Sequence, residues 1–163
     1  MSDFTHVPIV DLSGRAGDEA ERRALAEHLR GICHEIGFVV VTGHGLGSST
    51  IDDVFTLMDR FFALPADNKA LIDKARSPHF RGWEAVGAEQ TNNRRDIREQ
   101  IDLWSEWPEH QGDGPAYLNL LGPNQWMPEE LLPGSRRVMG RWFDELGALA
   151  NDLLGLLSMG LGL

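Results

Sequence analysis

The segment Gly37 to Leu46 reads GFVVVTGHGL and organises the sequence on both sides of it. Four apolar residues, Phe38 to Val41, stand between Gly37 and Gly43, and three of the four are β-branched. Such a run is typical of a strand that is buried on both faces, so it predicts a central strand. Gly37 itself is placed to end a preceding helix in the left-handed conformation.

Helices are predicted on both sides of this strand. Apolar residues recur at steps of three and four from Asp18 to Ile36 and again from Ser49 to Phe62, which is the spacing of one helical face. Pro65 then favours a new short helix from Ala66 to Lys74. Ahead of all of these, Val7 to Leu12 has the composition of a short strand. The first half therefore mixes helices with short strands.

The second half begins without a clear period. Ser77 to Arg95 contains glycines and asparagines in place of a repeating pattern, and this predicts a long loop. Residues near 97–104 alternate between two faces, which predicts a strand. From near 133 to 158 apolar residues recur at steps of three and four, which predicts a long helix.

Composition excludes several classes of function. The formal net charge of -10 argues against nucleic acid and anionic membranes as partners, because binding to phosphates depends mainly on Lys and Arg. No apolar run approaches the ~20 residues that a membrane helix needs. The single cysteine, Cys33, lies among the apolar positions of a helix, which predicts a buried and unreactive thiol. A cytoplasmic protein of one domain is expected.

The glycine loop from Gly43 to Gly47 departs from the nucleotide-binding patterns. Ser48 stands where the dinucleotide fingerprint has its third glycine, and no Gly-Lys-Ser/Thr follows. We therefore interpret the glycines as left-handed turn positions, and His44 as a turn residue that hydrogen-bonds to backbone. Nucleotide binding by this loop is kept as an alternative.

No catalytic or metal-binding motif is evident elsewhere. None of the six histidines begins a His-x-Asp or His-x-Glu pair, no cysteine pair offers a zinc site, and Gly-x-Ser-x-Gly is absent. Arg81 and Trp83 have two interpretations. Arg81 is either a solvated loop cation beside a packing tryptophan, or a clamp for a substrate carboxylate, a role that suits its planar fork of donors.

Six segments, taken in order, resemble the N-terminal region of the isopenicillin N synthase-like dioxygenases. Lys69 and Glu99 match a lysine and a glutamate of the family's pattern, whereas Trp83 stands where the family usually has tyrosine. The segments are VPIVDLSG (7–14), GFVVVTGHGL (37–46), FFALPADNKALI (61–72), FRGWEAVGAE (80–89), DIREQIDLW (96–104) and GPNQWMPE (122–129).

This resemblance implies an α+β fold in which residues 1–163 form the non-haem dioxygenase N-terminal domain. Its helices and first core strand would complete a jelly-roll (double-stranded β-helix) core that lies mostly beyond the chain. The parent enzyme would use Fe(II) and 2-oxoglutarate to hydroxylate, desaturate or cyclise a small molecule. The iron ligands would fall beyond Leu163, so we expect no catalytic residue, metal or cofactor on this chain alone, and no activity.

The partners implied by the resemblance are a small-molecule substrate and the C-terminal jelly-roll half. Arg81 and Trp83 are the expected substrate-binding residues, on a loop that borders the pocket. The apolar ending of the chain also suggests that the polypeptide continues, and we expect the helix face of Leu149, Leu153 and Leu156 to be uncovered. The other alternative is a non-catalytic interaction module of the same fold.

Overall fold

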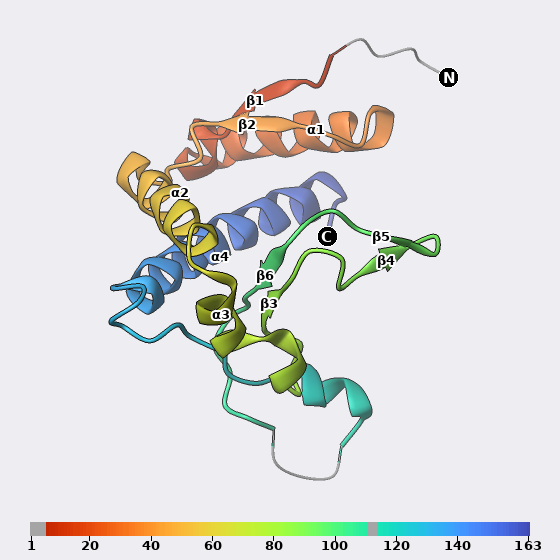
Figure 1. Cartoon of the computed structure of the whole chain (residues 1–163). Coiled ribbons are helices and arrows are strands. Elements are labelled where there is room, and N and C mark those ends of the chain that lie inside the picture. Colours follow the sequence, from red (N-terminus) through yellow and green to blue (C-terminus); the bar gives the residue numbers. More distant parts are fainter. Residues whose placement is uncertain (1–5, 111–113) are drawn as a thin grey trace. The chain divides into compact units, whose positions relative to one another are not determined.

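The computed structural model describes residues 6–110 and 114–163. These form two compact units, one built from residues 6–47 and 144–163 and the other from 48–110 and 114–143 (Figure 1). The long helix α4, Ser135–Gly160, contributes its first residues to the second unit and the rest to the first. No helix in the described ranges has the length and apolar character required to cross a membrane.

The first unit begins with two short parallel strands and a helix. Strand β1 (Ile9–Asp11) pairs with β2 (Val40–Thr42), with Ile9 opposite Val40. Between them lie the 3-10 turn η1 (Ser13–Ala16) and helix α1 (Glu19–Glu35). Asp18 caps α1 in a capping box with Glu21, and Gly37 follows the helix at a φ of 83°. The predicted helix and its glycine cap are therefore confirmed.

The prediction that Phe38 to Val41 form a central strand, buried on both faces, is wrong. Within the described residues β2 has a single partner, β1, and Phe38 and Val40 are 67% and 49% exposed. A two-stranded ribbon offers one packed face at most. An apolar run indicates that a strand is suited to burial. Whether it is buried depends on the tertiary structure around it.

The core of the first unit lies between the strands, α1 and the C-terminal part of α4. Leu12, Leu29 and Leu156 are its largest fully buried side chains. Leu149 and Leu153 pack against the same cluster. The prediction of an uncovered face at these leucines is therefore wrong, because residues of α1 from the same chain already cover it.

Cys33 is exposed on α1, contrary to the predicted buried thiol. Its neighbour Ile32 is buried, and so is Leu29 one turn earlier. Each residue advances about 100° around a helix, so the position after Ile32 turns away from the core.

The second unit is built from short elements around helix α2. The structure places α2 where the 3.6-residue period predicted a helix, whereas the helix predicted over 66–74 is a single α-turn followed by two 3-10 turns. The elements are α2 (Ser48–Phe62), α3 (Ala66–Lys69), η2 (Ala70–Ile72), η3 (Lys74–Arg76), β3 (Gly82–Glu84), β4 (Gln90–Thr91), β5 (Arg94–Arg95), β6 (Gln100–Asp102) and η4 (Ala116–Leu120).

The long loop predicted from Ser77 to Arg95 in fact contains three strands. β3 pairs antiparallel with β6, so that Trp83 lies opposite Ile101. β4 and β5 form a hairpin whose two turn residues, Asn92 and Asn93, have φ values of 52° and 61°. Two left-handed residues at a hairpin turn are typical of type I′, for which asparagine is favoured. The Asn-Asn pair was the signal for this hairpin.

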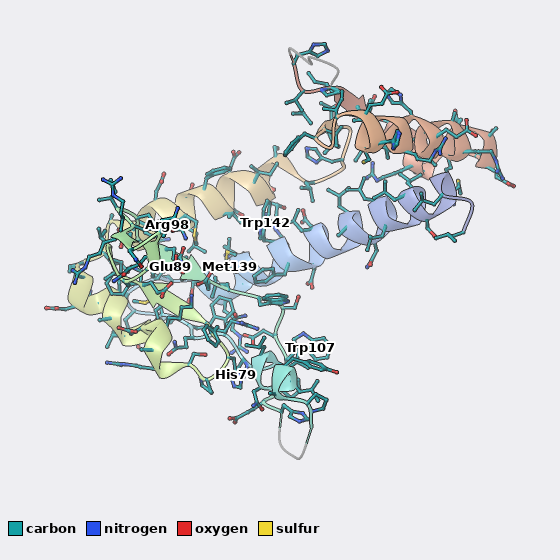
Figure 2. All side chains as sticks on the ribbon, turned by 90° about the vertical axis from the view of Figure 1, so that its right-hand side faces the viewer. His79, Glu89, Arg98, Trp107, Met139 and Trp142 are labelled. Carbon is teal, nitrogen blue, oxygen red and sulfur yellow. The ribbon has the colours of Figure 1, made fainter. Side chains whose placement is uncertain are left out.

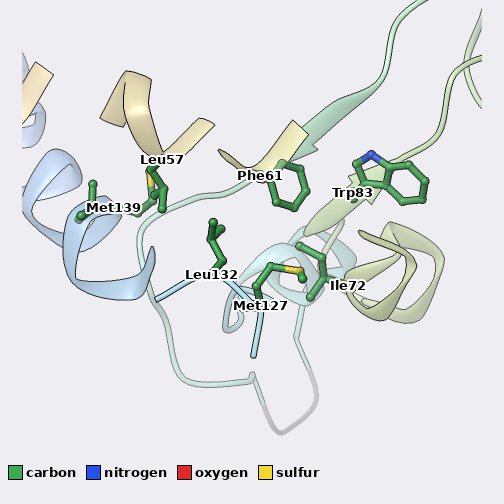
Figure 3. Close-up of a cluster of buried hydrophobic side chains, with 8 residues drawn as sticks. Leu57, Phe61, Ile72, Trp83, Met127, Leu132 and Met139 are labelled. Carbon is green, nitrogen blue, oxygen red and sulfur yellow. The ribbon is translucent and has the colours of Figure 1, made fainter. Parts of the chain in front are cut away.

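A single hydrophobic cluster holds the second unit together. Leu57 and Phe61 of α2 contribute to it, together with Ile72 of η2, Trp83 of β3 and Met139 of α4 (Figure 3). Met127, Leu132 and Val138 complete its buried members. The cluster fixes β3 and β6, and through them the side chains described next.

Candidate substrate-binding site

Arg81 is only 5% exposed, so the interpretation of it as a solvated loop cation is wrong. Its guanidinium donates hydrogen bonds to the carbonyl oxygens of His79 and Leu120, the latter at 2.8 Å. The guanidinium carbon also lies 5.1 Å from the centre of the Trp104 ring. Its Nε is buried and has no hydrogen-bond acceptor among the described residues. The Arg81 guanidinium is thus fixed by hydrogen bonds to backbone, and its Nε–H has no acceptor among the described residues.

No carboxylate in the described residues forms an ion pair with Arg81. Burial lowers the pKa of Arg81, and the negative charge of Asp102 only partly opposes this. A buried cation is costly unless an anion accompanies it. The surroundings of Arg81 therefore favour the arrival of an anionic group.

An open cavity of about 560 Å³ lies beside Arg81. Its volume is within the range of small-molecule sites. The walls are mostly apolar, with one buried cation and one ion pair among them. The lining residues are Lys74, Phe80, Arg81, Asp102, Leu103, Trp104, Leu120 and Leu121.

Lys74 forms the polar edge of this cavity. Its ammonium nitrogen lies 2.8 Å from Asp102 Oδ2 and 2.9 Å from Glu84 Oε2. Burial alone would lower the pKa of Lys74, but hydrogen bonds to Asp102 and Glu84 outweigh it, so the pKa lies above its ordinary value. Lys74 is therefore a fixed positive charge whose hydrogen bonds go to protein carboxylates.

The carboxylates around Lys74 are held in turn by other side chains. Gln100 donates hydrogen bonds to Glu84 at 2.6 Å and to Glu89 at 3.0 Å. Arg98 pairs with Glu89 at 2.5 Å, and the two side chains lie close together in Figure 2. The hydrogen bond from Arg98 lowers the pKa of Glu89 more than burial raises it. This network links β3 to β6 beside the cavity.

A second hollow, of about 480 Å³, adjoins the same residues. Lys74 and Phe80 line both spaces. The second hollow is more acidic, because Asp73, Glu84 and Glu89 face it alongside Lys74. Two spaces of different charge therefore share one wall.

Trp83 is buried in the hydrophobic cluster and does not line the cavity beside Arg81. Its indole N–H donates to Glu99 Oε2 at 2.8 Å, and Lys69 Nζ lies 2.7 Å from the same oxygen. Lys69 also lies 5.5 Å from the centre of the Trp83 ring. The interpretation of Trp83 as a packing residue is confirmed, and its indole, Lys69 and Glu99 form one polar cluster at the edge of the core.

Gln125 connects the strand after Arg81 to the preceding turns. Its amide nitrogen donates to the carbonyl oxygens of Asp73 at 2.8 Å and Arg81 at 2.7 Å. Gly82 lies beside this contact at a φ of 121°, and any side chain there would meet the carbonyl oxygen of Ile72. The Arg-Gly-Trp and Gly-Pro-Asn-x-Trp segments are thus joined by the hydrogen bond from Gln125 to the Arg81 carbonyl oxygen.

Replacing Gly82 by alanine should lower the free energy of unfolding by about 2 kcal/mol, because φ near 121° and the Ile72 carbonyl both exclude a methyl group. Urea denaturation followed by circular dichroism measures this. Gly87→Ala is the control: its φ is also positive, but the nearest atom to an added methyl is 3.6 Å away. Equal losses in the two variants would contradict the close approach at Gly82.

Stability should fall in acid through Glu99. The hydrogen bond from Lys69 lowers the pKa of Glu99 below its ordinary value of 4.5, against the effect of burial. A carboxyl whose pKa is lower in the folded state stabilises the protein above the unfolded pKa, and this contribution is lost as the pH falls through the folded pKa. Urea denaturation at about pH 7 and about pH 3.5 should show the loss. Glu99→Gln should reduce the difference, and an unchanged difference would contradict the assignment.

The glycine loop of the first unit is bound by an arginine of the same unit. Arg15 donates to the carbonyl oxygens of Gly43 at 2.5 Å and His44 at 2.9 Å, and it pairs with Asp152 at 3.3 Å. Gly43 and Gly45 have φ values of 59° and 78°, and the backbone N–H of Leu46 donates to His44 Nδ1. The predicted left-handed turn and the backbone hydrogen bond of His44 are confirmed.

The described residues do not provide a metal site. No group of three or more His, Cys, Asp or Glu side chains in residues 6–110 and 114–163 is arranged to hold an ion. A two-histidine, one-carboxylate iron site therefore does not fit these residues.

The family is shown by comparison with known proteins. Residues 7–129 match the model of the family described as "non-haem dioxygenase in morphine synthesis N-terminal". The chain belongs to this family. The expected membership in the N-terminal region of the 2-oxoglutarate/Fe(II) oxygenases is thereby confirmed.

Two relatives of the chain are fungal proteins named 2-oxoglutarate-dependent dioxygenases. The chain is 34% identical to frbJ of Dothideomycetidae sp., over 98% of this chain and 42% of frbJ. It is 32% identical to ecdK of Aspergillus rugulosus, over 88% of this chain and 45% of ecdK. The chain thus spans less than half the length of these curated relatives.

The fold is shared with larger proteins of known structure. A full-length protein of Neurospora crassa, solved in complex with alpha-KG, superposes with a TM-score of 0.79 at 24% identity, over 100% of this chain and 49% of that protein. A putative 2OG-Fe(II) oxygenase family protein from Caulobacter crescentus gives a TM-score of 0.78 at 22% identity, over 98% of this chain and 50% of that protein.

The resemblance to the family pointed to some residues near the site and not to others. Lys69 and Glu99 match the family pattern, and the structure shows that they form an ion pair in which the lysine is buried and the glutamate partly buried. Lys74, Phe80 and Trp104 carry no assigned role in that pattern. The alternation near 97–104 was the one signal for Trp104, because it placed Asp102 and Trp104 on the same face; no pattern pointed to Lys74 or Phe80.

Proposed function

We propose that this chain is the N-terminal part of a non-haem Fe(II), 2-oxoglutarate-dependent oxygenase that hydroxylates, desaturates or cyclises a small molecule. The match of residues 7–129 to the family model carries this proposal. The names of the fungal relatives support the reaction class.

In this proposal the iron and 2-oxoglutarate are held outside the 163 residues, on a jelly-roll core of the parent protein. The greater length of the relatives supports this arrangement, since the chain matches 42% of frbJ. The described residues also lack a ligand set for iron. The chain by itself is then inactive, and it supplies helices, strands and part of a pocket wall.

Arg81 is the residue of this wall that contacts the substrate. It lines the cavity, it is buried, and one of its donors is unused. Trp83 acts indirectly in this proposal, in place of the direct substrate contact expected for it. Its indole binds Glu99, the residue before β6, and so helps to fix β6 against β3, the strand that follows Arg81. The substrate group that meets Arg81 is an anion.

Succinate formation from 2-oxoglutarate in the presence of Fe(II) tests the proposal. The 163-residue chain should form none, whereas a longer polypeptide that includes the jelly-roll half should form it. In that longer protein, Arg81→Gln should raise KM for the primary substrate and leave KM for 2-oxoglutarate unchanged. Succinate formation by the short chain, or none by the longer one, would overturn the proposal.

A further inference from the structure

We propose that the cavity beside Arg81 binds a flat aromatic ring carrying a carboxylate, with Phe80 and Trp104 as its walls. As a statement about substrate class, this rests on the function proposed above. As a statement about binding, it concerns only residues of the second unit and is tested separately.

The carboxylate half of the ligand follows from the donors of Arg81. A guanidinium has five N–H donors in a fixed plane. Two of its nitrogens donate to the carbonyl oxygens of His79 and Leu120, and the N–H at Nε remains without an acceptor among the described residues. A carboxylate is the anion whose two oxygens match the paired N–H donors of a guanidinium.

The aromatic half follows from the walls of the cavity. Phe80 and Trp104 are 63% and 62% exposed although both line it, and Leu120 is 45% exposed. Large apolar side chains that gather around one cavity gain free energy when a ligand covers them. The Trp104 ring already stacks with the Arg81 guanidinium. An aromatic ring beside Trp104 places its own carboxylate in reach of the same cation.

Phe80 lies between the cavity beside Arg81 and the second hollow. Its φ of 57° lies in the left-handed region, which is rare for a bulky residue and costs free energy. The residue lines both the Arg81 cavity and the second hollow, and Lys74 Nζ lies 5.8 Å from its ring centre. Phe80 therefore forms a wall between the two spaces.

Charge determines the orientation of the ligand. Asp73, Glu84 and Glu89 line the second hollow, so an anionic group is repelled there. Lys74 offsets only one of these three charges, and its ammonium already donates to Glu84 and Asp102. The carboxylate is thus directed to Arg81 and the ring to the apolar walls.

Isothermal titration of the 163-residue chain tests this with three probes: 2-naphthoate, the neutral 2-naphthamide and the aliphatic decanoate. We expect 2-naphthoate to bind about tenfold more tightly than either of the others, because only it offers both the ring and the charge. Equal affinities for naphthoate and naphthamide, or for naphthoate and decanoate, would overturn the proposal, as would no binding at all.

Two variants locate the site. Trp104→Ala should weaken naphthoate binding about fivefold or more, whereas Trp107→Ala, an exposed tryptophan that does not line the cavity, should leave it unchanged. Phe80→Gly should weaken binding without loss of stability, because glycine adopts a positive φ freely. Equal effects of the two tryptophan variants, or full binding by Phe80→Gly, would place the ligand elsewhere and overturn the proposal.

The two proposals fail separately. Naphthoate binding that follows these variants, in a longer protein that forms no succinate, supports the ligand class and removes the oxygenase function. Succinate formation by a longer protein that does not bind naphthoate supports the oxygenase function and removes the ligand class.

Discussion

Phe61→Ala should lower the free energy of unfolding of the second unit by about 4 kcal/mol. The Phe61 side chain is fully buried in the cluster that joins α2, β3 and α4. Its ring packs edge to face with that of Phe62, with 5.1 Å between the ring centroids. Truncation of a buried phenylalanine removes apolar contact and leaves a cavity that the neighbours fill only in part. Urea denaturation followed by tryptophan fluorescence measures the loss.

The control lies on the same helix. Phe55 of α2 is 67% exposed, so Phe55→Ala should change stability by less than about 0.5 kcal/mol. Both substitutions replace phenylalanine by a better helix former, so helix propensity cancels between them. A loss at Phe61 no larger than the loss at Phe55 would show that the cluster is not the core of this unit.

Glu99→Gln should lower the free energy of unfolding by about 3 kcal/mol. The substitution keeps the size of the side chain but leaves Lys69, which is 6% exposed, without its ionic partner. An uncompensated buried charge is strongly destabilising, far more than the pair is stabilising. The indole N–H of Trp83 keeps an acceptor in the amide oxygen, so the effect is due to Lys69.

A double substitution tests whether the unpaired charge of Lys69 causes the loss of stability. Lys69→Met together with Glu99→Gln should recover much of the stability, because neither charge then remains buried. The exposed pair of Arg23 and Glu19 on α1 provides the control, and Glu19→Gln should have no measurable effect. Recovery no better than the single Glu99→Gln variant would contradict a charge-based explanation.

The motifs shared with the dioxygenase family are mainly structural in this unit. Lys69 and Glu99 come from two of the matched segments and meet in one ion pair, while Gln125 from a third binds the backbone at Arg81. Asn124 accepts from the backbone N–H of Trp104 and donates to its carbonyl oxygen. These contacts fix the strands that carry the cavity, which explains why the segments occur together.

The sequence by itself determined the helices, the family and the absence of familiar catalytic motifs. Helices α1, α2 and α4 follow from a local period of apolar residues, and Gly37, Gly43 and Gly45 from the need for a left-handed backbone. These properties depend on residues close together in the chain, so local patterns are sufficient to predict them.

Tertiary structure alone decided which side chains are covered and which charges meet. The GFVVVTGHGL segment suits a buried strand, yet β2 has one neighbour in the described chain and Phe38 stays exposed. Arg81 resembled a solvated cation, yet His79, Leu120 and Trp104 enclose it. Arg81 and Leu120 are 39 positions apart and come into contact only when the chain folds. A local pattern of apolar residues cannot predict such a contact.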